Sequence, residues 1–375
     1  MEPFRPTYAE IDLSCISGNI REIKRVLSPK TKFMAIVKAN AYGHGAVEIA
    51  KTAGSAGADY LGVASLGEAL ELRSASVNLP ILVLSETPHA FAERVIDAGI
   101  SQTVYTSELA QVLSDTARQK GRDVKVHVKI DTGMGRVGVM PDKAVALVKK
   151  IASLPNIFLE GVFTHFAKAD DPGSDMTLMQ FEKFRGLLQE IRSHGINVPI
   201  KHCANSAAML CFPRTHMDMV RIGICMYGLY PSDAARDKVH LRPALSFRTK
   251  VLYIKEVPAG TPLSYGATYL TPASTRIATL PVGYADGLSR GVSNKGSVLI
   301  RGKRYPVVGR VTMDMILVDA GRDRIEVGDD AVIIGEQGRE RITADDVAMM
   351  DETINYEVVC GIGKRVPRVY VKQGC

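Results

Sequence analysis

Eight short apolar segments, each followed by a stretch with helical periodicity, constrain the fold more than any other feature of the sequence. They cover residues 32–39, 60–65, 80–85, 101–106, 124–131, 158–166, 200–206 and 220–228. Near-continuous apolar strands separated by helices are typical of parallel sheets buried on both faces. Eight of them predict a closed (β/α)8 barrel, a fold that usually takes about 200–250 residues. An open doubly wound sheet would favour a G-x-G-x-x-G loop after the first strand, where KANAYGHG stands instead.

The character of the sequence changes after about residue 235. Strand-like segments with alternating apolar and polar residues, separated by Gly and Pro, follow at 245–257, 276–283, 296–311 and 329–336. Only the segment 342–351 has a helical pattern, with Thr343 and Asp346 in the positions of a capping box. We therefore predict an α/β protein with an N-terminal (β/α)8 TIM-like barrel in residues 1–238 and a mainly-β domain in residues 239–375.

Composition and charge exclude several classes of function. The formal net charge is +7, but the basic residues are spread along the chain and there is no Trp. Nucleic-acid binding favours a basic stripe with interleaved aromatic side chains, so we expect no nucleic-acid partner. The sequence contains no apolar run of about eighteen residues and no apolar signal core near its start. We therefore expect no membrane partner and a cytoplasmic location.

The cysteines and histidines do not form a metal-binding pattern. The six cysteines show no C-x-x-C spacing, and no His/Cys/carboxylate cluster has the spacing of a zinc site. We expect no metal and reduced thiols at Cys15, Cys203, Cys211, Cys225, Cys360 and Cys375.

Polar and basic residues gather where the predicted barrel strands end. Active sites of such barrels lie at the carboxyl ends of the strands. The residues in those positions are Lys38, the segment 131–136 with Arg136, His165, Asn205, Ser206, Arg221 and Gly223. An amine among other cations loses proton affinity, which suits Schiff-base chemistry at Lys38, and small polar residues suit a bound anion at Asn205–Ser206. An ordinary solvated lysine, a core histidine and simple turn residues are the alternatives at these positions.

Eight motifs distributed over the whole chain resemble those of alanine racemases, which are fold-type III pyridoxal-phosphate enzymes. They are MAIVKANAYGHG at 34–45, KIDTGMGRVG at 129–138, HCANSA at 202–207, RIGICMYG at 221–228, LSYGATY at 263–269, GYADGLSR at 283–290, GRVTMDM at 309–315 and TINYEV at 353–358. Any one of them could mislead, but eight in the family's order are highly specific.

The resemblance implies a catalytic pair and a dimer. The lysine matching Lys38 holds pyridoxal phosphate as a Schiff base and acts as one catalytic base, and the tyrosine matching Tyr265 acts as the other. Two bases on opposite faces make chemical sense, because a proton removed on one side must be replaced on the other to invert the centre. In the family this tyrosine comes from the neighbouring subunit, so a head-to-tail homodimer with shared active sites is implied.

The resemblance also implies binding roles. Arg221 would donate a hydrogen bond to the pyridine nitrogen, with His165 nearby. Arg136 and the backbone of Met313 would bind the substrate carboxylate, and Lys129 matches a lysine that is carbamylated in some members and orients Arg136. The phosphate would be surrounded by Tyr42, Ser206, Gly223, Ile224 and Tyr356. The narrow substrate channel would be formed by Tyr284, Tyr356, Arg290, Arg310 and Asp171.

The function expected from these motifs is interconversion of L-alanine and D-alanine, with supply of D-alanine for peptidoglycan. An amino-acid decarboxylase of the same two-domain plan is the nearest alternative, although SYGATY at 264–269 stands where such enzymes have a cysteine-containing motif. A pyridoxal-phosphate-binding homeostasis protein would be a bare barrel without the second domain. A barrel without a cofactor, using Lys38 and His165 in acid–base chemistry, is a further alternative. Serine is only one hydroxyl larger than alanine, so strict specificity for alanine does not follow.

Overall fold

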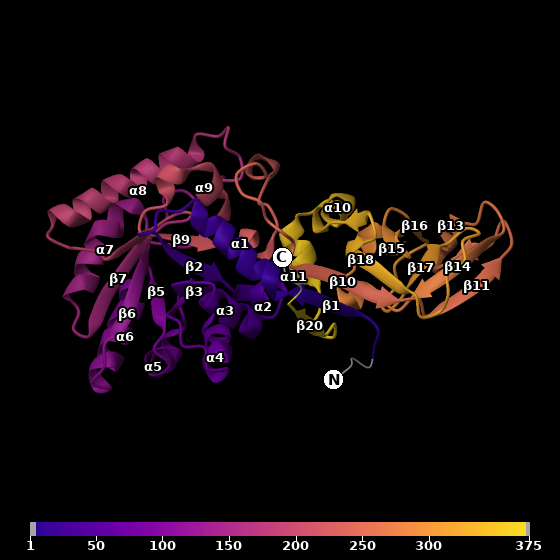
Figure 1. Cartoon of the computed structure of the whole chain (residues 1–375). Helices are drawn as coiled ribbons and strands as arrows, with labels where there is room; N and C mark the ends of the chain where they lie inside the picture. The colour runs from indigo at the N-terminus through magenta and orange to yellow at the C-terminus, as the bar shows by residue number, and fades with distance from the viewer. Residues whose placement is uncertain (1–4, 373–375) are drawn as a thin grey trace. The chain divides into compact units, whose positions relative to one another are not determined.

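The computed structural model describes residues 5–372, and the chain divides into two compact units (Figure 1). One unit comprises residues 15–41 and 46–242, and the other comprises the N-terminal residues to 14, residues 42–45 and the residues from 243 onward. The expected boundary at 238/239 thus differs by a few residues from the observed one at 242/243. The N-terminal strand also belongs to the second unit instead of the first. Cys375, for which we expected a reduced thiol, lies outside the described residues.

The first unit is an eight-stranded parallel barrel, as the sequence predicted. Its strands are β2 (Lys32–Ile36), β3 (Tyr60–Val63), β4 (Ile81–Val83), β5 (Ser101–Val104), β6 (Val124–Lys129), β7 (Ile157–Phe163), β8 (Ile200–His202) and β9 (Met219–Ile222). The sheet order is β8-β7-β6-β5-β4-β3-β2-β9. Between β8 and β9 the backbone hydrogen bonds Asp218 N to Lys201 O and Arg221 N to Ala204 O, of 3.1 and 3.0 Å, nearly close the barrel.

Helices surround these strands in the order that alternation predicts (Figure 1). They are α1 (Leu13–Arg25), α2 (Lys38–Tyr42), α3 (Ala46–Ser55), α4 (Leu66–Ser74), α5 (Ala92–Asp97), α6 (Ser107–Gln119), α7 (Pro141–Ser153), α8 (Met176–Ser193) and α9 (Ser206–Cys211). Strands β3, β4 and β5 are buried at every residue, because both faces of a parallel sheet are covered. Side-chain caps at Ser65 and Thr106 fix where α4 and α6 begin.

The second unit is mainly β. Its strands are β1 (Tyr8–Asp12), β10 (Leu245–Lys250), β11 (Tyr253–Val257), β12 (Pro262–Leu263), β13 (Tyr269–Leu270), β14 (Thr275–Leu280), β15 (Ser297–Ile300), β16 (Lys303–Val308), β17 (Ile316–Asp319), β18 (Asp330–Gln337), β19 (Glu340–Ile342) and β20 (Arg368–Val371). The main sheet has the order β11-β14-β17-β16-β15-β18-β10-β1-β20, and β12 and β13 form a separate hairpin. Two short helices, α10 (Ala344–Met350) and α11 (Asn355–Gly361), complete it. The capping box predicted at Thr343 and Asp346 is confirmed at the start of α10.

The part of the chain that the structure describes contains no metal-binding cluster, no disulfide bond and no membrane-spanning helix. Within residues 5–372, no group of three or more His, Cys, Asp or Glu side chains is arranged to hold a metal ion. None of the five cysteines in that range forms a disulfide bond. None of the helices in the described part of the chain is both long and apolar enough to span a membrane.

Candidate active site

Lys38 is separated from the end of β2 by Val37 and begins α2, a turn of left-handed helix. Ala39, Asn40 and Ala41 have φ of 51–53° and ψ of 46–52°, and Tyr42 has φ of 52°. Four consecutive non-glycine residues in this region are strained, so the surrounding structure must impose the conformation. This strained turn fixes how the backbone leaves the barrel immediately after Lys38.

Three hydrogen bonds hold the left-handed turn. The Ala41 N–H donates to Val37 O at 2.9 Å, and the Ala39 N–H donates to the Glu68 carboxylate at 2.7 Å. The Asn40 side-chain oxygen accepts from the N–H of Ala46, the first residue of α3, at 2.9 Å. These bonds pair polar groups that the unusual backbone would otherwise leave unpaired.

The Asp131–Arg136 segment after β6 is a loop organised by one carboxylate. The Asp131 side chain accepts hydrogen bonds from the backbone N–H groups of Gly133, Met134, Gly135 and Arg136 at 2.8–3.2 Å. Burial alone would raise the pKa of Asp131, but these backbone hydrogen bonds outweigh it and lower the pKa. The loop therefore leaves the Arg136 side chain exposed, with its backbone held.

Arg221 on β9 is the central cation of the barrel interior. One amino nitrogen donates to Thr164 O and Cys203 O at 2.8 Å and contacts His165 Nδ1 at 3.1 Å. The other contacts His202 Nδ1 at 3.0 Å. Within the described residues no hydrogen bond reaches Arg221 Nε. This Nε–H group remains available as a donor to a ligand.

Lys129 and His165 are in the same electrostatic environment as Arg221. Burial, together with the charges of Arg136 and Arg221, lowers the pKa of Lys129 to about 8. Burial and the Arg221 charge also lower the pKa of His165 well below its usual value. Lys38 is a further cation that acts on both groups. The barrel mouth therefore combines high positive charge with neutral His165 and a readily neutralised Lys129.

Small polar groups from β8 and β9 meet beside this cluster. Asn205 caps α9 by accepting a hydrogen bond from Ala208 N–H at 2.9 Å. The Gly223 N–H donates to the buried Ser206 hydroxyl oxygen at 3.0 Å, and Ile224 is fully buried. The Ser206 hydroxyl also forms a hydrogen bond with the side chain of buried Cys225.

The predicted phosphate residues outside the barrel lie together in the second unit. The rings of Tyr42 and Tyr356 have centroids 6.0 Å apart and are tilted by 49°. Burial raises the pKa of Tyr42, so its hydroxyl remains protonated. Two residues more than 300 positions apart in the sequence thus have their phenol rings side by side.

Tyr265 lies on a tight turn between β12 and β13. Its side chain is 73% exposed. Ser264 before it has φ of 62°, and its hydroxyl donates to Arg310 O at 2.7 Å. A Cβ placed on Gly266 would lie 3.2 Å from the Arg310 guanidinium, so this arginine packs directly against the turn. The turn therefore brings Arg310 beside the backbone that presents Tyr265.

The Tyr284 turn and the Met313 loop are joined by backbone hydrogen bonds. Tyr284 N–H donates to Thr312 O at 3.0 Å, and Ala285 N–H donates to Met313 O at 3.1 Å. A Cβ on Gly283 would lie 2.3–2.5 Å from the Thr312 and Met313 backbone, so only glycine fits there. The side chains of Tyr284 and Met313 are exposed.

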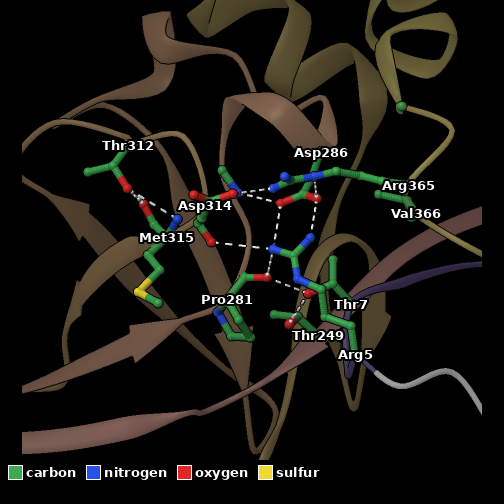
Figure 2. A network of polar contacts seen from close by, with 12 residues as sticks. Arg5, Thr7, Thr249, Pro281, Asp286, Thr312, Asp314, Met315, Arg365 and Val366 are labelled. Atoms are coloured by element: carbon green, nitrogen blue, oxygen red, sulfur yellow. Dashed lines mark hydrogen bonds and ion pairs between the residues drawn. The ribbon is translucent and has the colours of Figure 1, made fainter.

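A buried carboxylate, that of Asp286, connects the segments around the Tyr284 turn through hydrogen bonds, as Figure 2 shows. The fully buried Asp286 accepts hydrogen bonds from Arg5 at 2.5 and 2.9 Å and from Arg365 at 2.7 Å. Arg365 also donates to Asp314 at 2.6 Å. The Gly283 N–H donates to Asp286 at 2.9 Å, so the network reaches the turn that carries Tyr284. We had not predicted a role for Asp286, although a carboxylate inside the motif GYADG was a usable signal.

Two predicted channel residues lie apart from these contacts. Arg290 is exposed at the start of a short 3-10 helix, residues 290–292. Asp171 is exposed in the loop before α8, where it pairs with Lys168 at 2.9 Å and accepts from Gly173 N–H. Among the described residues, no hydrogen bond or ion pair joins either of them to another predicted site residue.

Comparison with known proteins identifies the family to which this chain belongs. The family described as "Alanine racemase, N-terminal domain" matches residues 11–231, and "Alanine racemase, C-terminal domain" matches residues 244–370. The chain belongs to the alanine racemase family. As a member of this family it is an enzyme. The chain is 47% identical over 375 residues to "Alanine racemase 2" of Caldanaerobacter subterraneus subsp. tengcongensis, covering 100% of this chain and 97% of that protein.

Solved structures of alanine racemases have the same architecture. That of Clostridium difficile 630 superposes with a TM-score of 0.95 at 41% identity, covering 99% of this chain and 97% of that one. A histidine racemase from Leuconostoc mesenteroides subsp. sake is also similar, with a TM-score of 0.91, 29% identity and 99% of both chains covered. The two-domain architecture is therefore shared by racemases with different substrates.

Proposed function

We propose that this enzyme interconverts L-alanine and D-alanine with pyridoxal phosphate as its cofactor. The proposal is carried by the cationic cluster at the end of the barrel strands, where Lys38 and Arg136 act with Arg221 on Lys129 and His165. When bound, pyridoxal phosphate withdraws electrons from an amino-acid substrate and makes its α-proton removable.

The residues of the barrel fit the groups of this cofactor. Lys38 provides the amine that would attach it. Arg221 can only donate hydrogen bonds, so its Nε–H fits an unprotonated pyridine nitrogen and disfavours protonation there. His165 would lie near the ring through its contact with Arg221. The phosphate would be held by Ser206, Gly223, Ile224, Tyr42 and Tyr356, with Asn205 fixing the start of α9.

Two bases would move the proton. Lys38 Nζ takes or returns the α-proton on one face of the substrate, and Tyr265 Oη does so on the other. A base works best when its environment is closed to water, whereas Tyr265 is 73% exposed in the single chain. We infer that Tyr265 completes the site of a partner subunit, which makes the enzyme a homodimer with shared active sites.

Substrate binding is proposed for groups that suit a small carboxylate. Arg136 would hold the carboxylate through charge-assisted hydrogen bonds, together with the Met313 N–H, and a carbamylated Lys129 would orient Arg136. The remaining residues would narrow the access channel: Tyr284, Tyr356, Arg290, Arg310 and Asp171. We further propose a cytoplasmic location and, from the family resemblance, D-alanine supply for peptidoglycan.

The test is incubation of the purified enzyme with L-alanine and measurement of D-alanine. Lys38→Ala should abolish the reaction, and Tyr265→Phe should slow it by about 10²–10⁴-fold, the usual contribution of a positioned acid or base. Tyr253→Phe removes the hydroxyl of another exposed tyrosine of the second unit and should leave the rate unchanged.

Other outcomes would reassign the enzyme. Release of carbon dioxide without D-alanine would identify a decarboxylase. Faster conversion of L-histidine than of L-alanine would place the enzyme with the histidine racemase. Full activity of Tyr265→Phe in both directions would contradict the two-base assignment while leaving the reaction intact.

A further inference from the structure

Four buried side chains form a continuous line inside the barrel, and only the last of them, Arg221, was expected to have a role. The Glu160 carboxylate on β7 lies 3.1 Å from His127 Nε2. His127 Nδ1 lies 2.9 Å from His202 Nε2, and His202 Nδ1 lies 3.0 Å from Arg221. Each of these residues is at most 4% exposed. The line therefore connects the Arg221 guanidinium to a carboxylate two imidazole rings away.

The two ends of this line determine where every proton lies. The guanidinium can only donate, so His202 Nδ1 must accept and the His202 proton lies on Nε2. His202 Nε2–H then donates to His127 Nδ1, which places the His127 proton on Nε2. His127 Nε2–H in turn donates to the carboxylate, which can only accept. Both rings are neutral Nε2–H tautomers, because any other arrangement places two donors or two acceptors in contact.

The charges of the groups agree with this order. Burial lowers the pKa of His127 and lowers that of His202 well below its usual value, so both rings are neutral at pH 7. Burial alone would raise the pKa of Glu160, but hydrogen bonds from His127 and Lys125 lower it to about 2. The acceptor end of the line therefore remains a carboxylate throughout the physiological range.

Glu160 is itself fixed by partners near the amino ends of the barrel strands. One carboxylate oxygen accepts from Tyr60 at 3.0 Å and from Lys125 at 2.8 Å. The other accepts from Ser101 at 2.9 Å and from His127. Four donors occupy the two oxygens, so the carboxylate cannot turn away from His127 without breaking other bonds.

Packing fixes the two rings as well. A Cβ on Gly161 would lie 2.2 Å from His127 Nδ1, so the absence of a side chain there makes room for the ring. The Phe163 ring stacks on His202 with centroids 4.6 Å apart and an angle of 9°. Strand β7 thus supplies the carboxylate, the space and the stacking partner from Glu160, Gly161 and Phe163.

We propose that Glu160 is a positioning residue, which fixes the direction of the His127–His202 relay and thereby holds the Arg221 guanidinium in one orientation. Through the relay, Arg221 contacts a neutral imidazole instead of a carboxylate. No adjacent negative charge therefore offsets the positive charge that the guanidinium presents to a ligand. The consequence for catalysis rests on the proposed function, in which Arg221 meets the cofactor ring. The order of protons within the relay does not depend on it.

The order of protons is tested directly by nitrogen-15 NMR of histidine-labelled holoenzyme between pH 6 and 9. His127 and His202 should both give the signals of neutral Nε2–H rings over the whole range, assigned by their loss in His127→Gln and His202→Gln. A ring protonated on Nδ1, or an imidazolium ring, would overturn the proposal. Neutron diffraction of wild-type crystals gives the same answer if the assignment variants do not fold.

The effect on Arg221 is tested with three variants. Glu160→Met removes the acceptor at similar size, and we expect kcat/KM for alanine to fall roughly tenfold, as when an outer partner of a metal ligand is lost. The ratio of transamination to racemisation should rise, because a displaced Arg221 no longer disfavours protonation of the ring nitrogen. Glu160→Gln keeps one acceptor oxygen and should recover much of the wild-type ratio. Lys149→Met changes an exposed lysine of α7 and should change neither quantity by more than about twofold.

The outcomes separate the relay from the proposed reaction. A folded Glu160→Met enzyme with wild-type kcat/KM and an unchanged transamination ratio would show that Glu160 is structural only. Racemase activity together with reversed histidine tautomers would refute the relay alone. A wild-type protein with the expected tautomers but no D-alanine formation would refute the proposed function and leave the proton order standing.

Discussion

At the scale of single residues, Lys129 is the group whose chemistry the barrel alters most plainly. It is almost fully buried, and burial with the charges of Arg136 and Arg221 lowers its pKa to about 8. A lysine whose folded-state pKa is depressed is neutral at lower pH than a free one. A neutral amine can attack carbon dioxide, forming an N–C bond and releasing a proton, which yields a carbamate.

We therefore predict carbamylation of Lys129 that increases with pH. With ¹³C-bicarbonate, a carbamate signal should be strong near pH 8.5 and weak near pH 6.5, where the amine is protonated. Lys129→Met should abolish the signal, whereas Lys125→Met, on the same strand with a half-exposed side chain, should retain it. A wild-type spectrum without the signal at any pH would contradict the prediction.

Asp286 allows a prediction about stability against pH. Burial would raise the pKa of this carboxyl, but hydrogen bonds from Arg5, Arg365 and the Gly283 N–H lower it. A folded-state pKa below the unfolded value of about 3.9 gives stability that is present above that pH and lost as pH falls through the folded pKa.

Asp286→Asn keeps an acceptor for Gly283 but loses the charge. It should lower the free energy of unfolding at pH 7 by about 2–3 kcal/mol, the size of hydrogen bonds to charged groups. The difference from wild type should shrink below about pH 4, where the carboxyl group of the unfolded wild-type chain becomes protonated. Denaturant titration at several pH values measures both effects. Asp233→Asn, an exposed carboxylate paired with Arg236, is the control and should change stability by less than about 1 kcal/mol. An equal loss at pH 7 and pH 3 would contradict the assignment.

At the scale of elements, the left-handed turn after Lys38 is the most strained part of the described chain. A non-glycine residue in this conformation costs roughly 1–2 kcal/mol, and glycine instead loses about 0.5–1 kcal/mol of additional chain entropy on folding. Ala39→Gly should therefore stabilise the protein by about 0.5–1 kcal/mol. Ala146→Gly, at an exposed position of the right-handed helix α7, should destabilise it by about 1 kcal/mol. Thermal unfolding of both variants checks the opposite signs, and two losses of equal size would exclude the left-handed turn.

The elements that could be predicted are those that a short stretch of sequence identifies by its own residue pattern. All eight barrel strands were found because burial on both faces makes most of them rich in apolar residues, and the capping box at Thr343–Asp346 was found because its spacing is fixed. The left-handed turn at 39–42 could not be predicted, because it contains no glycine, the residue that usually indicates this conformation. Strand β1 is short, and its partners β10 and β20 lie more than 200 residues away in the sequence, so local patterns cannot reveal their pairing.

The candidate site was predicted less evenly than the fold. The barrel topology predicts that active-site residues lie at the carboxyl ends of the strands, and this is where Lys38, Arg221 and Ser206 are found. Glu160 lies within an apolar run, and a charged residue in FLEGVF was the one signal available for it. Its link to His127 and His202 depends on the register of three neighbouring strands, which no motif encodes.

At the scale of the whole molecule, the division into two units assigns the two proposed bases to different units. Lys38 belongs to the barrel unit and Tyr265 to the mainly-β unit. The Tyr265 turn, with Arg310 packed against it, presents an exposed phenol. If a partner subunit supplies Tyr265 to each Lys38, neither single variant can be active alone, yet the two variants together can be.

Mixing the variants tests this arrangement. Lys38→Ala and Tyr265→Phe proteins, each inactive or nearly so, are combined in equal amounts, dissociated and reassociated. Half of the dimers should be hybrids, and in each hybrid one site pairs the intact Lys38 with the intact Tyr265 while the other carries both changes. Activity should therefore return to about one quarter of the wild-type value, since one dimer in two has one good site of two. Reassociated Lys38→Ala dimers mixed with Lys38→Ala/Tyr265→Phe dimers are the matched control, because no combination of those chains contains Lys38. If each chain used its own Tyr265, the hybrids would gain nothing, and the activity of the mixture would equal the mean of the two parents.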